Sequence, residues 1–414
     1  MAVHRDLRAH AGAASRIPRT CPLSARQDVM SHVSDNDQNA ALHPYHGVRI
    51  LDMTYRYGSY AGRLFADLGA EVIRIEPPGG LPDRIEAERG GTGALARFMF
   101  FNASKKSLVL DLATQGGIDA FDELARGALA IFVERGGPMY DRIAHLRAVA
   151  PQAVVTAVSP FGMTGPLADA PASDLVIQAA GGIAWMSGRI EEAPLSLPFD
   201  QATMVASIYA ATVTAIALVD TEATGAGHLI DVSAQECIAH SLQNAIQVWD
   251  LEQRVSMRGG EGTRDASEDI FPCKDGFVFL AAPLALGSSF KSLVGFMQDR
   301  GHPSGAKFAE PCWQDREWRL TREARDAFRA IFTDFTRDFD RETLTREAIA
   351  RRIVMGPVSR VSDIFDDPQL AHRGFFRTMT VAGREIAFPG PPYKITPELW
   401  SVSPPPLRNG EQGE

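Results

Sequence analysis

Two aspartates and a threonine stand out as residues that can take part in chemistry. Asp200 precedes a long apolar stretch, Thr203 lies three residues later, and Asp174 lies upstream of both. An aspartate carboxylate has a reference pKa of about 3.9, so at neutral pH it is ionised and acts as a nucleophile or general base. Asp200 is equally well placed to be an N-cap, and Asp174 to be a buried hydrogen-bonding residue.

Histidines and cysteines do not form a recognisable site. Three histidines occupy no motif position and are interpreted as structural: His145, His228 and His240. Four cysteines lie far apart in the sequence: Cys21, Cys237, Cys273 and Cys312. Their spacing fits neither zinc ligands nor a disulfide framework. We therefore expect no metal site and a reducing, cytoplasmic compartment.

The composition restricts the partners of the chain. Its 414 residues include 42 lysines and arginines against 51 aspartates and glutamates, a net charge of −9 at pH 7. This balance favours neither nucleic acid nor an anionic membrane, so an anionic ligand would need a local basic pocket. The longest apolar helical stretch, 204–219, is shorter than the roughly 20 residues of a bilayer span. We expect it to be a buried core helix.

Residues 1–44 contain scattered arginines, serines and alanines without the apolar core of a secretory signal. We interpret them as a disordered extension, with Met30 as a candidate natural start. An organellar transit peptide is the alternative.

Strand-like and helical stretches alternate through the first half of the chain. Apolar runs typical of strands lie at 48–53, 71–76, 107–112, 128–133, 153–158 and 229–232. Helical stretches lie between several of them, at 59–68, 115–126 and 140–148. This alternation predicts an α/β fold with an open parallel sheet. The stretch after Pro77–Gly80 is expected to be a loop as far as about Ala94.

The sequence pattern changes beyond Trp249, and we expect a second domain to begin there. Lys274-Asp275-Gly276 separates two strand-like runs and predicts a hairpin. Charged helices are expected over 315–352. The turn after the first strand, YRYGSYAG at 55–62, lacks the G-x-G-x-x-G spacing, so a nicotinamide-dependent dehydrogenase is disfavoured.

Eight segments in order resemble the class III CoA-transferase family, which includes formyl-CoA transferase, carnitine CoA-transferase and, as relatives, the α-methylacyl-CoA racemases. They are GVRILDMT, FADLGAEVIRIEPPGG, FNASKKSLVLDL, SPFGMTGPLADAPASDLVIQAAGG, IYAATVTAIAL, TGAGHLIDVS, KDGFVFLA and DDPQLAHRGFF. Each segment alone is weak, but the eight occur in family order, and the resemblance runs from about residue 47 to residue 406. The resemblance implies acyl-CoA and a carboxylic acid as substrates, with no permanently bound cofactor.

The resemblance also implies the organisation of the chain. A large Rossmann-like domain with an open parallel sheet is expected over 45–248 and is completed by 385–414. A linker and a smaller α+β domain are expected over 249–384. Two chains of this family interlock like links, so the resemblance implies an interlocked homodimer.

The CoA-binding residues are carried over from matching positions. CoA presents phosphates and an adenine, which need cations, backbone N–H groups and a flat apolar slot. The resemblance assigns these contacts to Tyr57, Gly58, Asn102, Lys105 and Arg142. Without it, Lys105 and its neighbour would be a solvated pair at the mouth of a strand. The segment 87–97 is expected to shape the acyl pocket.

The family's nucleophile is an aspartate at the start of the helix written here as IYAATVTAIAL. It attacks the thioester to form a mixed anhydride, which the released CoA thiolate converts to an aspartyl-CoA thioester that the acceptor acid then attacks. Counting without gaps from Gln178 and from Thr224 places this aspartate at Thr203. The nearest carboxylate is Asp200. On one helix the two residues share a face but stand about 4.5 Å apart along the axis.

Three functions therefore stay open. The first is a CoA-transferase that uses Asp200 and an aspartyl intermediate. The second is a CoA-thioester isomerase, racemase or lyase using Asp174 and Glu236 as acid and base, although Ser173 stands where the racemases have a histidine. The third is a catalytically inactive CoA-binding subunit, which the threonine at position 203 favours.

Overall fold

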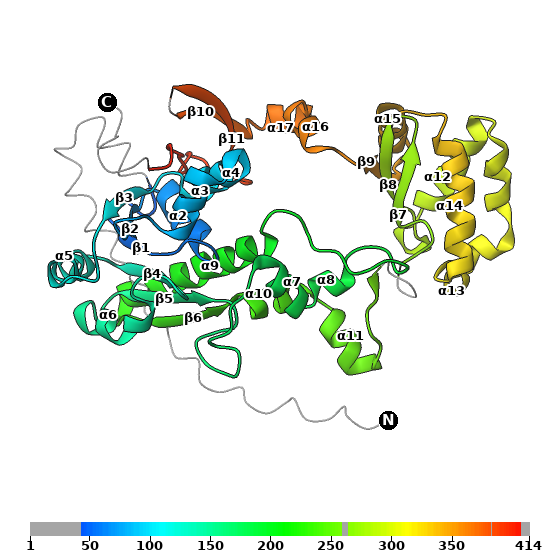
Figure 1. The fold of residues 1–414 in the computed structure, drawn as a ribbon. Helices are drawn as coiled ribbons and strands as arrows, with labels where there is room; N and C mark the ends of the chain where they lie inside the picture. The colour runs from blue at the N-terminus through cyan, green and yellow to red at the C-terminus, as the bar shows by residue number, and fades with distance from the viewer. Residues whose placement is uncertain (1–42, 259–263, 382, 407–414) are drawn as a thin grey trace, which may run out of the picture.

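The computed structural model describes residues 43–258, 264–381 and 383–406. A large lobe on the left of Figure 1 contains a sheet covered by helices, and a smaller lobe lies on the right. The sheet of the large lobe has six strands in the order β3-β2-β1-β4-β5-β6, and all its strand pairs are parallel. The predicted α/β fold is confirmed. The predicted extension falls almost entirely outside the described residues.

The large lobe contains the following elements along the chain: β1 (Arg49–Asp52), α2 (Ser59–Asp67), β2 (Glu71–Glu76), α3 (Pro82–Arg89), α4 (Gly91–Asn102), β3 (Lys106–Val109), α5 (Gln115–Arg126), β4 (Ala130–Glu134), the 3-10 helix η2 (Tyr140–Arg142), α6 (Ile143–Val149), β5 (Val154–Ser159), α7 (Asp174–Ala180), α8 (Ile183–Met186), α9 (Gln201–Thr224), β6 (Leu229–Ser233), α10 (Ala234–Ser241) and α11 (Ala245–Glu252). The predicted strands and the helices at 59–68 and 115–126 are confirmed to within a few residues.

The central strands β4 and β5 are buried along their whole length and are mostly apolar, as expected for strands covered on both faces. Successive residues of β1 serve opposite faces: Ile50 packs in the cluster beneath α2, α9 and α10, and Leu51 packs in the cluster beneath α5 and α6. Gly69, with φ of 95°, lets the chain leave α2 in a left-handed turn and enter β2. These two clusters cover the two faces of the sheet.

The prediction of a loop up to Ala94 was wrong, because α3 and α4 occupy this stretch. Pro82 takes the first helical position of α3 and Asp83 its first turn, where a fixed φ and a negative charge both favour a helix start. Gly91, with φ of 75°, connects α3 to α4. The glycine-rich, charged composition suggested a loop, but the stretch forms two helices, and ion pairs connect α3 to the end of β2.

Helix α9 is longer than the predicted stretch and spans 24 residues. By length and composition alone it could cross a membrane. One face is lined with small residues, and there Thr214 Oγ1 lies 2.7 Å from Thr156 Oγ1 of β5. The opposite face leaves Ile216 and Val219 exposed. The helix therefore packs on the sheet with one face only.

The small lobe has an antiparallel sheet in the order β7-β8-β9 and a core rich in phenylalanine. Its elements are β7 (Asp269–Cys273), β8 (Gly276–Ala281), η4 (Leu284–Leu286), α12 (Ser289–Asp299), η5 (Pro303–Ala309), η6 (Pro311–Gln314), α13 (Arg316–Arg319), α14 (Arg322–Thr336), α15 (Arg341–Arg351) and β9 (Val354–Pro357). The predicted hairpin is confirmed, since Cys273 pairs with Gly276.

The end of the chain returns to the large lobe, as Figure 1 shows. It runs through α16 (Val361–Phe365), α17 (Pro368–His372) and the antiparallel pair β10 (Phe376–Val381) and β11 (Arg384–Pro389). Met379 and Phe388 of this pair pack against Ala103 of the large lobe. The β10–β11 pair thus begins inside 249–384, the range that the sequence analysis assigned to the linker and small domain. The exact domain boundaries and the interlocked dimer stay predictions.

Candidate active site

A small hollow lies where α3 and α4 approach the start of α9. Its walls combine charged, aromatic and hydroxyl side chains: Tyr55, Arg56, Pro82, Asp83, Glu86, Arg97, Phe98, Phe101, Asp200 and Thr203. The structure therefore brings two of the three predicted catalytic residues, Asp200 and Thr203, to one place. It adds Arg56, Glu86 and Arg97, which the sequence analysis did not select.

The chain enters α9 through an unusual backbone conformation. Phe199 and Asp200 have φ of 61° and 48°, in the left-handed region. This region is uncommon for a bulky residue such as phenylalanine, and such residues cluster at functional sites. Asp200 occupies the N-cap position, but its side chain makes no capping hydrogen bond. Asp200 therefore occupies the N-cap position that the sequence suggested, but its side chain does not cap the helix.

Asp174 provides the cap that Asp200 does not. Its Oδ1 accepts a hydrogen bond of 2.8 Å from the backbone N–H of Thr203, in the first turn of α9. Its Oδ2 accepts one of 2.6 Å from Gln178, whose side-chain amide also bonds in both directions to the backbone of Leu197. Ser173, just before it, caps α7. Asp174 therefore ties α7 to α9 from beside the hollow.

Asp200 forms an ion pair on the rim of the hollow. Its Oδ2 lies 3.4 Å from Arg97 Nη1, and Arg97 also forms an ion pair with Glu86 of α3. All three side chains are partly exposed. Exposed ion pairs contribute little to stability, typically about 0–1 kcal/mol, so this chain of charges can rearrange when a ligand arrives.

Thr203 lies deeper than Asp200. It is 1% exposed, and its Oγ1 has no hydrogen-bond partner among the described residues. Leaving a buried polar group unpaired costs about 1–3 kcal/mol. No base contacts this hydroxyl, because the bond from Thr203 to Asp174 is made by the backbone N–H. The hydroxyl is therefore not activated as a nucleophile.

The turn after β1 is held by Glu134, at the end of β4. Its Oε2 accepts hydrogen bonds from the N–H groups of Tyr55, Arg56 and Gly58. Burial raises the pKa of Glu134 to about 7, although these backbone N–H groups act in the opposite direction. A side chain at Gly58 would meet Thr54 Cγ2 at 2.6 Å, so glycine keeps the turn close to the strand.

Tyr57 lies in the same turn and is buried. Its hydroxyl donates to the carbonyl of Ala172, and burial raises the pKa of Tyr57 to about 12. The carbonyl of Tyr57 accepts a bond of 2.7 Å from Ser207 of α9. Tyr57 and Gly58 thus lie at the carboxyl edge of the sheet, the usual ligand side of an open α/β sheet.

Lys105 and Asn102 are buried rather than solvated at a strand mouth. Lys105 Nζ lies 2.8 Å from Asp52 Oδ2 and also donates to Asn102 Oδ1 and to the carbonyl of Ser59. Burial lowers the pKa of Lys105, and Asp52 opposes this effect. A side chain at Gly62 would approach Asp52 Oδ2 to 2.3 Å, so the ion pair requires glycine there.

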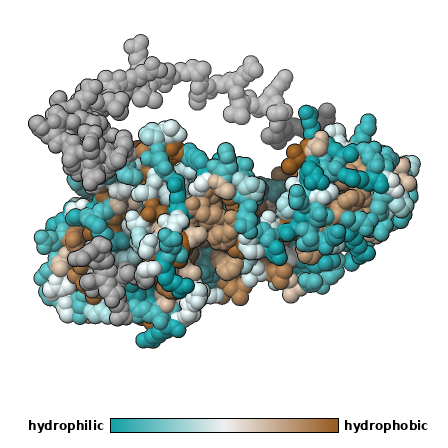
Figure 2. All heavy atoms as spheres, turned by 90° about the horizontal axis from the view of Figure 1, so that it is seen from above, coloured by the Kyte–Doolittle hydropathy of each residue, from teal (hydrophilic) through white to brown (hydrophobic). Residues whose placement is uncertain are grey.

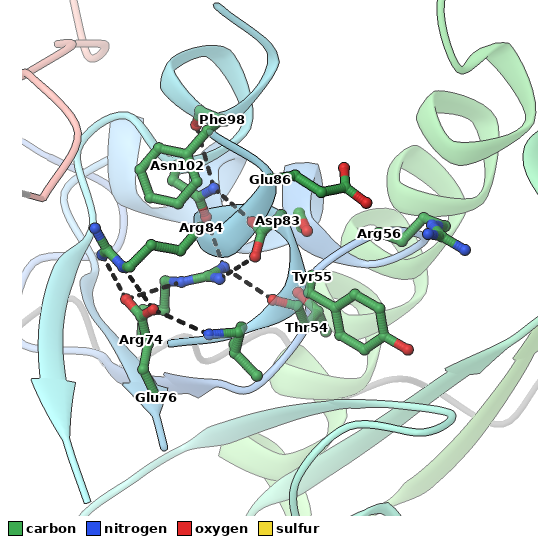
Figure 3. Close-up of polar contacts among 12 residues, drawn as sticks. Thr54, Tyr55, Arg56, Arg74, Glu76, Asp83, Arg84, Glu86, Phe98 and Asn102 are labelled. Carbon is green, nitrogen blue, oxygen red and sulfur yellow. Dashed lines mark hydrogen bonds and ion pairs between the residues drawn. The ribbon is translucent and has the colours of Figure 1, made fainter. Parts of the chain in front are cut away.

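Asn102 belongs to a buried network that Figure 3 shows. Arg74 donates to Asn102 Oδ1 and to the carbonyl of Thr54, and it pairs with Asp83 and Glu76. Burial would raise the pKa of Glu76, but hydrogen bonds and charges from Arg84 and Arg74 lower it to about 2. In the figure Tyr55, Arg56 and Glu86 extend away from this network. The network holds α3 in place, whereas the side chains of Tyr55, Arg56 and Glu86 line the hollow.

Arg142 does not join the hollow. It is exposed in η2, after the strand that carries Glu134, and is not among the lining residues. No group of three or more histidine, cysteine or acidic residues placed to hold a metal occurs within 43–258, 264–381 or 383–406.

Some of the missed residues carried a signal in the sequence. Arg56 follows the first strand of a parallel sheet, and ligand contacts commonly come from such turns. Arg97 falls at the end of the stretch expected to shape the acyl pocket, but it lies on α4 rather than in a loop. Glu86 had no signal, because its importance depends on α3 packing beside α4.

Comparison with known proteins identifies the class to which this fold and site belong. The chain matches CoA-transferase family III over residues 45–412 and belongs to that family. It is 33% identical to the succinyl-CoA:(R)-benzylsuccinate CoA-transferase subunit BbsE of Thauera aromatica, over 88% of this chain and 91% of that protein. It is 28% identical to the succinyl-CoA–L-malate CoA-transferase alpha subunit of Chloroflexus aurantiacus, over 88% and 86%.

Solved structures agree on the fold. The crystal structure of a CAIB/BAIF family protein from Brucella suis matches with a TM-score of 0.77 at 22% identity, over 88% of this chain and 96% of that one. Rv3272 from Mycobacterium tuberculosis matches with a TM-score of 0.72 at 23% identity, over 88% and 97%. The predicted family and its fold are thus confirmed, and transfer of CoA is the general activity of the named relatives.

Proposed function

We propose that this chain is a CoA-transferase subunit that binds an acyl-CoA and a carboxylic acid and relies on another chain for the nucleophilic aspartate. The observation that carries the proposal is Thr203. It occupies the counted position of the family aspartate, in the first turn of α9, and no base contacts its hydroxyl. A neutral hydroxyl without a base does not attack a thioester at neutral pH.

Asp200 is poorly suited to replace that aspartate. It precedes the helix in a left-handed conformation and pairs with Arg97 on the rim of the hollow. Catalytic groups must hold their geometry within about 0.5 Å, and Asp200 stands three residues from the counted position. A guanidinium beside a carboxylate also stabilises its charge and lowers its tendency to attack a carbonyl carbon.

The CoA is proposed to bind at the carboxyl edge of the sheet. Tyr57, Gly58 and Arg142 stay the proposed contact residues, and Asn102 and Lys105 stay proposed residues of the CoA site. Because the polar atoms of Asn102 and Lys105 bond to protein groups, we propose that these two act by holding the turn after β1 in place. Exposed Arg142 is the residue of this set that can reach a phosphate directly.

The partner is proposed to be a second chain of the same family. Both relatives described above are named as subunits of CoA-transferases. Helix α9 leaves Ile208, Ile216 and Val219 exposed, and Figure 2 shows hydrophobic residues gathered near the middle of the molecule. Exposed apolar patches of this kind mark association surfaces. An interlocked pair, predicted above as a homodimer, would cover them, and a cytoplasmic location stays part of the proposal.

A second candidate keeps the complete reaction on this chain. Asp200 lines the same hollow as Thr203, which favours it as the nucleophile. Its carboxylate would attack the thioester carbonyl, release CoA thiolate and form a mixed anhydride. The thiolate would then release the donor acid and form an aspartyl-CoA thioester, which the acceptor carboxylate would attack. The isomerase alternative has less support, since Asp174 caps α9 and exposed Glu236 does not line the hollow.

A trapping experiment separates the two candidates. The purified chain is incubated with a panel of acyl-CoA thioesters and hydroxylamine, and CoA binding is measured in parallel. Hydroxylamine converts an aspartyl anhydride or thioester into a stable hydroxamate that mass spectrometry locates. The proposal predicts CoA binding with an unmodified peptide around Asp200 and Thr203. A hydroxamate on Asp200 would replace it with the second candidate.

A further inference from the structure

We propose that a cavity between the end of α17, the start of β10 and the segment 391–400 binds a nucleoside diphosphate. The cavity encloses about 400 Å³, within the roughly 300–1,000 Å³ of small-molecule sites. It shares no lining residue with the hollow at the start of α9. The proposed site is therefore separate from the candidate active site and independent of the proposed function.

The cavity forms where the chain returns from the small lobe to the large lobe, which Figure 1 shows at α17 and β10. Gly374, with φ of 59°, turns the chain from α17 towards β10. The carbonyl of Phe375 accepts a hydrogen bond of 2.7 Å from the N–H of Gly390. This bond brings the start of the segment 391–400 beside the turn, so both stretches contribute walls to one cavity.

The wall formed by the segment 391–400 is anchored to the large lobe. The carbonyl of Leu399 lies 3.1 Å from His43 Nδ1, and the N–H of Ser401 donates a bond of 2.8 Å to the carbonyl of Asp67. Trp400, between these two anchors, is 8% exposed and lines the cavity. A wall that is already in place does not have to be ordered when a ligand binds, which favours affinity.

Positive charge gathers in this cavity although the whole chain carries a net charge of −9. Arg373, Arg377 and Lys394 line it, and Glu398 is the one acid among the described lining residues. Glu398 pairs with Arg377. Within 43–258, 264–381 and 383–406, neither Arg373 nor Lys394 forms an ion pair. Two cations are thus left for an anionic ligand.

These two cations suit phosphate groups. The planar guanidinium of Arg373 can bind two phosphate oxygens at once, and the ammonium of Lys394 is a compact charge that binds a single group. Two unpaired cations on different segments of the chain match a ligand with two linked anionic groups better than one with a single charge. A diphosphate meets this requirement.

Aromatic side chains line the same cavity and point to a ring on the ligand. They are Phe375, Tyr393 and Trp400. Burial raises the pKa of Tyr393, so its hydroxyl stays neutral at pH 7 and does not repel a phosphate. Every nucleobase has a flat face that stacks on aromatic side chains. Inorganic diphosphate would leave these faces unused, whereas a nucleoside diphosphate uses both them and the cations.

Calorimetric titration of the purified full chain with ADP tests the proposal, in the assembly that the protein forms in solution. Adenosine, which lacks the phosphates, and inorganic pyrophosphate, which lacks the ring, are the matched ligands. We expect ADP to bind at least about tenfold more tightly than either. Absence of saturable ADP binding up to about 1 mM would overturn the proposal. So would pyrophosphate binding that is as tight as that of ADP.

Variants of the lining residues locate the site. Arg373→Gln and Lys394→Gln each remove an unpaired cation and should weaken ADP binding about tenfold. Tyr393→Ala removes a stacking surface and should weaken the binding of ADP but not that of pyrophosphate. Arg384→Gln, at an exposed position of β11 outside the cavity, is the control and should leave ADP binding unchanged.

The replaced side chains are exposed, so the variants should fold, and far-ultraviolet circular dichroism verifies this. Equal affinity of Arg373→Gln, Lys394→Gln and Arg384→Gln for ADP would contradict a site in this cavity.

CoA carries an adenine nucleotide of its own, and titration of the same variants with CoA separates this source from a free nucleotide. We expect Arg373→Gln to lower the affinity for ADP and to leave that for CoA unchanged, and ADP to bind in the presence of saturating CoA. Equal losses for both ligands would place the nucleotide end of CoA in this cavity and overturn a separate site. Because no turnover is involved, a hydroxamate on Asp200 would refute the proposed function without affecting this result.

Discussion

The carboxylate of Asp174 accepts a hydrogen bond of 2.8 Å from the backbone N–H of Thr203, and this bond links helix α7 to the first turn of α9. Asp174, which the sequence analysis selected as a candidate catalytic residue, thus positions the first turn of α9. It also fixes the orientation of the turn in which the family's nucleophile is expected.

Loss of this cap should destabilise the chain. In Asp174→Ala, the N–H of Thr203 and the side chain of Gln178 lose their partner. We expect the free energy of unfolding to fall by about 1–2 kcal/mol, the usual effect of removing a helix cap. Urea denaturation measures it. Asp326→Ala, at an exposed carboxylate, is the control and should stay within about 0.5 kcal/mol. An unchanged stability of Asp174→Ala would rule out the capping role.

Two neighbouring lysines should differ sharply when replaced. Lys105→Met leaves Asp52 buried without its ion-pair partner, and this typically costs about 3–5 kcal/mol. Lys106→Met removes an exposed lysine paired with Glu71, and the expected change is below about 1 kcal/mol. Chemical denaturation of both variants measures the difference. If Lys105→Met lost CoA binding at full stability, Lys105 would be a ligand contact rather than a structural residue.

Glu134 should make stability depend on pH. Its pKa of about 7 in the folded protein is above the ordinary 4.5, so between these values the folded state binds the proton more tightly than the unfolded chain. The contribution of Glu134 to the free energy of unfolding therefore decreases as pH rises from about 4.5 to about 7, by up to about 3 kcal/mol.

Denaturation of Glu134→Gln over this pH range measures that contribution. The side chain of glutamine does not titrate, so the difference in stability between the unsubstituted chain and the variant should shrink with rising pH. Glu123→Gln, at an exposed position of α5, is the control for a removed carboxylate. A difference that grows with pH would show that the three backbone N–H groups outweigh burial.

The regular part of the fold was predictable because strand and helix periods are local properties. The apolar run 71–76 is a strand with those bounds, and the helix 115–126 likewise has its predicted ends. The stretch 81–102 was not predictable from composition. Its two helices depend on Pro82 at a helix start and on packing over Asn102 and Arg74, contacts that join residues far apart in the sequence.

The site was predictable only in part for a similar reason. The count along the chain brought Asp200 and Thr203 to attention, and both line the hollow. It could not distinguish their environments, because Asp200 meets Arg97 from a helix 103 residues earlier. The role of Asp174 as a cap likewise depends on tertiary contact with α9. Sequence supplied the candidates, and only the packing of helices assigned their roles.

The most direct test of the account is to place an aspartate at position 203. The chain, its Thr203→Asp variant and the Thr203→Asn control are treated with succinyl-CoA and hydroxylamine, and the peptide around α9 is sequenced by mass spectrometry. We predict a hydroxamate at position 203 in Thr203→Asp alone, with Asp200 unmodified in all three proteins. A hydroxamate on Asp200 of the unsubstituted chain would contradict the account and make Asp200 the nucleophile.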